Sequence, residues 1–222
     1  MGITRLRHNR VSLALHELDT RGGPKLLLLH GLGEHAPARV PDELRCWPGP
    51  VYALDFTGHG ESTIPRGGGY TAEILMADAD AALAQLGRAT VVGEGLGAYV
   101  GLLCAGGRPR LVRGAILCDG PGLAGGSARP GTPQLALPEP GAVAPPDPFA
   151  LLELGSDVRP PDYASSFVRQ ATHLSGLERP LSVCARERPD WLVAVLAEPG
   201  VESCELEPAL AYHAAVAARE RP

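Results

Sequence analysis

The chain has 222 residues, of which 45% are hydrophobic and 20% charged, and its formal net charge is −5. These values are typical of a folded globular protein and exclude a disordered chain, and an acidic balance without a long basic run argues against nucleic acid as a partner. No apolar stretch reaches the roughly 18 residues of a membrane span, and the first seven residues lack the apolar core of a signal peptide. We therefore expect a single cytoplasmic domain over residues 1–222 that binds neither nucleic acid nor a membrane.

The five cysteines are scattered along the chain and odd in number. Their spacing matches neither a metal site nor a disulfide framework, and most of them fall inside expected strands or helices. We predict buried free thiols, with no metal ion and no cofactor. The cysteines are Cys46, Cys104, Cys118, Cys184 and Cys204.

The first half of the chain predicts strands separated by short turns and one helix. Thr71 is a suitable N-cap for this helix, which has an apolar face and ends at Gly87. Short apolar runs such as Lys25-Leu26-Leu27-Leu28-Leu29 are typical of strands covered on both faces. The expected strands are two weak ones within residues 3–18, followed by 25–30, 51–56 and 89–93.

The second half continues the alternation after an interruption. Residues 120–148 are dominated by Gly, Pro and Ala and predict little regular structure. Around them we expect strands at 111–119, 181–185 and 201–206, helices at 148–154, 162–174 and 189–197, and a closing helix from near His213 to near Glu220. Strands that alternate with helices in this way indicate a mostly parallel sheet with helices on both faces.

Three motifs each follow an expected strand. His30-Gly31-Leu32-Gly33 comes after the strand at 25–30, and Asp55-Phe56-Thr57-Gly58-His59-Gly60-Glu61-Ser62 begins as the strand at 51–56 ends. The third motif, Gly93-Glu94-Gly95-Leu96-Gly97, is followed by small residues at helical spacing, which allow a helix to pack closely on a sheet. In this order the three motifs resemble the α/β-hydrolase superfamily of serine esterases and lipases, in which G-x-S-x-G forms a tight turn between strand and helix, the nucleophile elbow.

The resemblance implies roles for particular residues. The N–H groups of Leu32, beside Gly31, and of Leu96 would form the oxyanion hole. Glu94 would support the elbow from beneath, and Asp55 and His59 would hold their loop rather than react. Residues 120–160 would form a short lid-like insertion.

His213 lies late in the chain, where the family carries its catalytic base. Its acid partner is open between Asp119, after the strand at 111–119, and the group of Glu187 and Asp190 after the next strand. Asp119 is slightly preferred because it ends a well-defined strand and precedes a glycine.

Gly95 stands where the family has its nucleophilic serine, and glycine has no hydroxyl or thiol for acyl transfer. Two functions remain open. In the first, His213 activates water against a small ester-like or apolar substrate held by the oxyanion donors. In the second, the protein is an inactive homologue that binds a small ligand or another protein. A third alternative, which the sequence leaves open, is that Gly95 replaces a natural serine.

Overall fold

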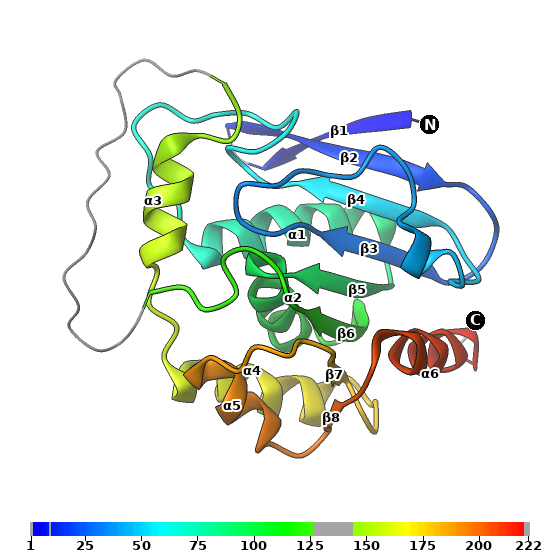
Figure 1. Ribbon diagram of the computed structural model, residues 1–222. Coiled ribbons are helices and arrows are strands. Elements are labelled where there is room, and N and C mark those ends of the chain that lie inside the picture. The colour runs from blue at the N-terminus through cyan, green and yellow to red at the C-terminus, as the bar shows by residue number, and fades with distance from the viewer. Residues whose placement is uncertain (1, 9, 127–143, 220–222) are drawn as a thin grey trace.

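The computed structural model describes residues 2–8, 10–126 and 144–219. Within these ranges, eight strands form one sheet in the order β1-β2-β4-β3-β5-β6-β7-β8 (Figure 1). The pairs β1/β2 and β2/β4 are antiparallel, and every other neighbouring pair is parallel. The strands are β1 (Gly2–His8), β2 (Val11–Asp19), β3 (Lys25–Leu29), β4 (Val51–Asp55), β5 (Ala89–Glu94), β6 (Val112–Cys118), β7 (Leu181–Val183) and β8 (Val201–Ser203).

Helices cover both faces of this sheet. Two separate clusters of buried apolar side chains fill the space between layers, one beneath α1, α2, α4 and α5 and the other beneath α6 and the short helix η1. The helices are η1 (Asp42–Leu44), α1 (Ala72–Leu86), α2 (Leu96–Gly107), α3 (Pro148–Ser156), α4 (Pro161–Leu174), α5 (Asp190–Leu196) and α6 (Leu206–Arg219). The α/β class and the predicted mostly parallel sheet are confirmed.

The helix α1 forms for the reasons expected from its sequence. The Thr71 hydroxyl accepts a hydrogen bond from the Ile74 N–H at 3.3 Å, which satisfies one of the unpaired donors of the first turn. Gly87 ends the helix with φ of +76°, a conformation that costs glycine little. The predicted apolar face, which includes Leu75 and Leu83, is fully buried.

Two expectations near the C-terminus were wrong. The strand expected over 201–206 ends at Ser203, and the closing helix begins at Leu206 rather than near His213. This shift places His213 inside the helix, with consequences for the site. Of the expected lid over residues 120–160, the structure describes 120–126 and 144–160, where α3 is the helix expected at 148–154.

Candidate functional site

Gly95 occupies the tight turn between β5 and α2, at the carboxyl edge of the sheet. Its backbone has φ of +55° and ψ of −115°, a combination in which a residue with a side chain is strained. The flanking glycines permit a very close approach of strand and helix. A Cβ atom on Gly93 would lie 2.2 Å from the Gly97 carbonyl oxygen, and one on Gly97 would lie 2.2 Å from the Leu29 carbonyl oxygen.

The two candidate oxyanion donors point at a carbonyl group of the protein itself. The N–H groups of Leu32 and Leu96 both donate to the Pro121 carbonyl oxygen, each at 2.9 Å. A Cβ atom on Gly95 would lie 2.1 Å from that same oxygen. The loop after β6 therefore fills the space in which a serine side chain at position 95 and a substrate carbonyl would have to meet.

Two further side chains hold this loop from the other side. The Trp191 indole Nε1–H donates to the Leu123 carbonyl oxygen at 2.9 Å, and the Arg159 guanidinium donates to the same oxygen. Arg159 is buried and stacks 4.6 Å above the centre of the Tyr99 ring, and burial lowers its pKa to about 10. The sequence offers no signal for this arrangement, because its acceptors are backbone groups of a loop rich in glycine.

His213, predicted as the base beside Gly95, does not lie at this edge, and the structure does not bring the two residues together. It is fully buried in α6, where its Nε2 atom lies 3.0 Å from the Ser182 hydroxyl. Ser182 pairs with Ile116, which pairs with Val92. Because Val92 lies three residues before Gly95 and a strand rises about 3.3 Å per residue, the imidazole sits about 10 Å below the turn. Burial, and secondarily the nearby Arg179 charge, lower the pKa of His213 to about 4.

Neither predicted acid serves His213. Asp119 accepts hydrogen bonds from the Arg186 N–H at 2.8 Å and the Glu187 N–H at 2.9 Å, and so ties the loop after β6 to the loop after β7. Asp190 is exposed at the start of α5, on the face of the sheet opposite α6. The Nδ1 atom of His213 has no hydrogen-bond partner within the described part of the chain.

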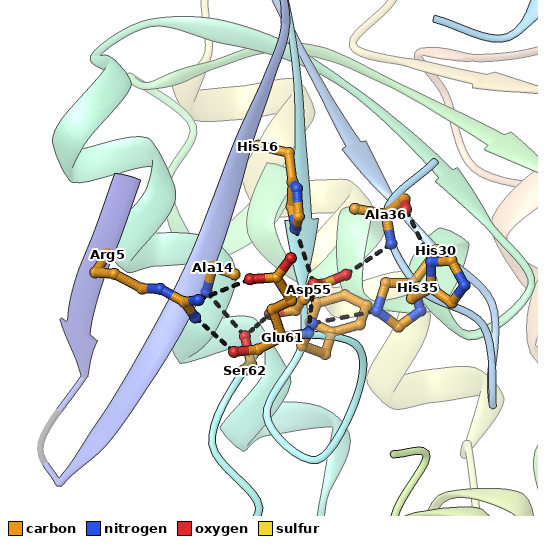
Figure 2. Close-up of polar contacts among 10 residues, drawn as sticks. Arg5, Ala14, His16, His30, His35, Ala36, Asp55, Glu61 and Ser62 are labelled. Atoms are coloured by element: carbon orange, nitrogen blue, oxygen red, sulfur yellow. Dashed lines mark hydrogen bonds and ion pairs between the residues drawn. The ribbon is translucent and has the colours of Figure 1, made fainter. Parts of the chain in front are cut away.

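The motif from Asp55 to Ser62 has the structural role expected of it. The buried Asp55 carboxylate accepts from the Ala36 N–H at 2.7 Å and the Glu61 N–H at 2.8 Å, and lies 2.8 Å from the His16 imidazole (Figure 2). The Ser62 hydroxyl donates to the Asp55 carbonyl oxygen at 2.6 Å. These bonds join the motif to β2 and to the loop after β3.

The two histidines of the motifs also hold backbone. The Phe56 N–H donates to His30 Nε2 at 3.1 Å, and the Gly33 N–H donates to His59 Nε2 at 3.2 Å. Burial and the neighbouring His59 lower the pKa of His30 to about 3, so its imidazole is neutral at pH 7.

A cavity of about 510 Å³ opens beside the turn, at the carboxyl ends of β3, β4 and β5. Its walls include the apolar residues Leu28 and Val92, while Glu34, Glu43 and Glu94 contribute carboxylates. Burial, followed by the charges of Glu34 and Glu43, raises the pKa of the half-buried Glu94. Sequence reasoning placed Glu94 under the turn but missed the cavity, because its wall includes residues of the distant η1 region.

Within the described ranges, no helix is both long and apolar enough to cross a membrane. Over the same residues, no group of three or more His, Cys, Asp or Glu side chains is arranged to hold a metal ion.

Solved structures share this architecture. A thioesterase domain from the curacin biosynthetic pathway matches 97% of this chain and 99% of its own at 17% identity, with a TM-score of 0.63. An N-formylmaleamic acid deformylase variant from Pseudomonas putida S16 matches 92% of both chains at 16% identity, with a TM-score of 0.58. At these identities the similarity establishes the fold alone.

Other similar structures are longer. An E-2-(acetamidomethylene)succinate hydrolase is 30% identical over 54% of this chain, with a TM-score of 0.48, and this chain covers 44% of its length. No curated protein matches the sequence significantly. The model of the alpha/beta hydrolase family, however, matches residues 26–221. The chain therefore belongs to the alpha/beta hydrolase family.

Proposed function

We propose that this protein is a hydrolase homologue that has lost acyl transfer and binds a small ligand in the cavity beside Gly95. The observation that carries the proposal is the Pro121 carbonyl oxygen, which accepts hydrogen bonds from both candidate oxyanion donors. An oxyanion hole works by leaving its donors available to charge that develops in the transition state. Donors already paired with a backbone carbonyl have no such capacity.

The alternative, hydrolysis by activated water, lacks the base expected for it, His213. A general base must come within hydrogen-bond reach of the proton that it removes, and His213 is buried about 10 Å below the turn by the rise of the strands. Of the other histidines near the edge, His30 and His59 hold backbone N–H groups through their Nε2 atoms, and His35, which lines the cavity, has its Nδ1 atom 2.9 Å from the Ala36 carbonyl oxygen. Binding without covalent chemistry is therefore the better-supported function.

The lining of the cavity defines the class of ligand. Its volume of about 510 Å³ lies within the usual range for small-molecule sites. The apolar walls favour a hydrocarbon or aromatic body, and the carboxylates of Glu34, Glu43 and Glu94 favour a positively charged or hydrogen-bond-donating group. We infer that the ligand is a small amphiphilic amine.

The test compares primary alkylamines and arylalkylamines with neutral alcohols of the same shape, by calorimetry and thermal shift. We expect binding of the amines only, and a loss of about tenfold or more in affinity for Glu94→Gln, because one charge-assisted bond contributes roughly 1.5–3 kcal/mol. Glu207→Gln removes the same charge from the exposed surface of α6 and should leave affinity unchanged.

Equal binding of amines and alcohols, or equal effects of the two variants, would contradict the assignment of the ligand. Turnover of any ester, amide, epoxide or lactone by the wild-type protein would contradict the loss of catalysis.

A further inference from the structure

Three cysteines lie in a row across the carboxyl ends of three adjacent parallel strands. Leu117 of β6 pairs with Val183 of β7, and Val183 pairs with Ser203 of β8. Cys118, Cys184 and Cys204 each follow one of these paired residues, one position beyond the last pairs of the two ladders, and the Cys184 side chain contacts those of Cys118 and Cys204. The Cys184 N–H donates to the Leu117 carbonyl oxygen at 2.8 Å, and the Cys204 N–H donates to the Val183 carbonyl oxygen at 3.2 Å.

The three side chains share one face of the sheet. Successive residues of a strand point to opposite faces, and Leu117 and Val183 belong to the core beneath α1 and α2. All three cysteines accordingly pack against the other core, beneath α6, and each is partly exposed to solvent.

Neighbouring strands lie about 4.8 Å apart, so residues directly after paired positions are spaced within the range of about 4.4–6.8 Å between the Cα atoms of disulfides. Cys184 therefore has a thiol neighbour on each side. Cys118 belongs to β6, which is hydrogen-bonded between β5 and β7 in the middle of the sheet. Cys204 follows a three-residue strand at the edge, where the backbone can adjust to the geometry of a disulfide.

We propose that Cys184 and Cys204 are a reversible thiol–disulfide pair, a modification site separate from the cavity. The oxidant is a low-molecular-weight disulfide such as oxidised glutathione. The Cys204 thiolate attacks one sulfur of the oxidant and releases one thiol, which leaves a mixed disulfide. The Cys184 thiolate then attacks the protein sulfur of that mixed disulfide and releases the second thiol. Two protein S–H bonds are lost, one S–S bond forms, and the oxidant is reduced to two thiols.

The surroundings make this exchange slow at neutral pH. Burial and the nearby charges of Cys184 and Glu202 raise the pKa of Cys204 to about 11. Contact with the Cys118 thiol, burial and the charge of Glu205 raise the pKa of Cys184. Since the thiolate is the attacking species, the rate should rise close to tenfold for each pH unit between 7 and 9.

The experiment uses the full chain with Cys46→Ser, which removes the exposed thiol. The protein is incubated with excess oxidised glutathione at pH 7, 8 and 9, alkylated to stop exchange, and mapped by peptide mass spectrometry. We expect a peptide pair joined through Cys184 and Cys204, a mass lower by two hydrogens, no persistent glutathione adduct, and a rise in Tm of several degrees because the bond closes the loop that contains α5.

Matched variants separate the assigned pair from its neighbour. Cys118→Ser should still form the Cys184–Cys204 disulfide. Cys204→Ser should instead carry a glutathione adduct or remain unmodified. A Cys118–Cys184 bond, a stable glutathione adduct without a cross-link, or free thiols after hours at pH 9 would overturn the proposal. The main mapping uses folded Cys46→Ser protein, which keeps Cys118, Cys184 and Cys204. Its result therefore does not depend on whether a substitution at one of these three cysteines destabilises the protein.

Discussion

Gly95→Ala tests whether the turn and the loop after β6 are fitted to one another. A side chain at this φ of +55° costs about 1–3 kcal/mol by itself. The new Cβ atom would also lie 2.1 Å from the Pro121 carbonyl oxygen, so the loop must move and weaken two hydrogen bonds, each contributing about 1 kcal/mol. We expect a loss of about 3–5 kcal/mol in the free energy of unfolding.

Gly176→Ala is the control for strain alone. Gly176 has φ of +74°, and no atom of the described residues lies within 4 Å of where its Cβ atom would be. Its substitution should cost about 1–2 kcal/mol. Urea titration followed by circular dichroism measures both variants and the wild type. Equal costs for the two substitutions would refute the proposed fit between turn and loop.

Gly95→Ser adds a hydroxyl at the same position and meets the same obstruction. We expect it to lose as much stability as Gly95→Ala and to remain unlabelled by a fluorophosphonate, because His213 is buried in α6 and cannot reach the hydroxyl. Labelling of the folded variant, or new ester hydrolysis, would show that a base does reach the residue 95 hydroxyl, and would contradict the argument that His213 lies too far away.

Three further outcomes follow from the structure. The pKa of histidine in the unfolded chain is about 6.5, whereas that of His213 in the folded protein is lowered to about 4. As the pH falls, the unfolded state therefore binds the proton first, and the free energy of unfolding should fall by about 3 kcal/mol between pH 6.5 and 4. His213→Gln should remove this part of the pH dependence, as measured by urea unfolding. Trp191→Phe keeps a six-membered aromatic ring but loses the bond to the Leu123 carbonyl oxygen and leaves a small cavity in the core, so it should cost more than about 1–2 kcal/mol in the same assay. The amides of Leu32 and Leu96 should exchange slowly in hydrogen–deuterium exchange followed by NMR, and exchange at the rate of open loops would contradict their pairing with Pro121.

The turn could be predicted because its constraints are local. Gly93, Gly95 and Gly97 are spaced as a tight strand-to-helix turn requires, and the structure has each of them in a position where a side chain would collide with backbone. The same holds for the Asp55 motif, whose partners are backbone groups of its own loop and of nearby segments, together with the His16 imidazole.

The groups that lie next to the turn could not be predicted in this way. The Pro121 carbonyl oxygen is a backbone group, so nothing in its residue type announces that it will accept two hydrogen bonds. His213 was misplaced because its role was inferred from its order along the chain. Once α6 begins at Leu206, its helical phase directs His213 toward the buried Ser182 rather than toward the carboxyl edge.

The mutual fit of Gly95 and the Pro121 loop also limits which single substitutions the protein can tolerate. A serine acquired first would strike the loop, and a loop withdrawn first would leave two amide protons without an acceptor next to a helix terminus. Each single step lowers stability before any chemistry is gained. Under the proposed function, serine hydrolysis therefore requires both changes together, along with a base at the sheet edge, and neither change alone is favoured.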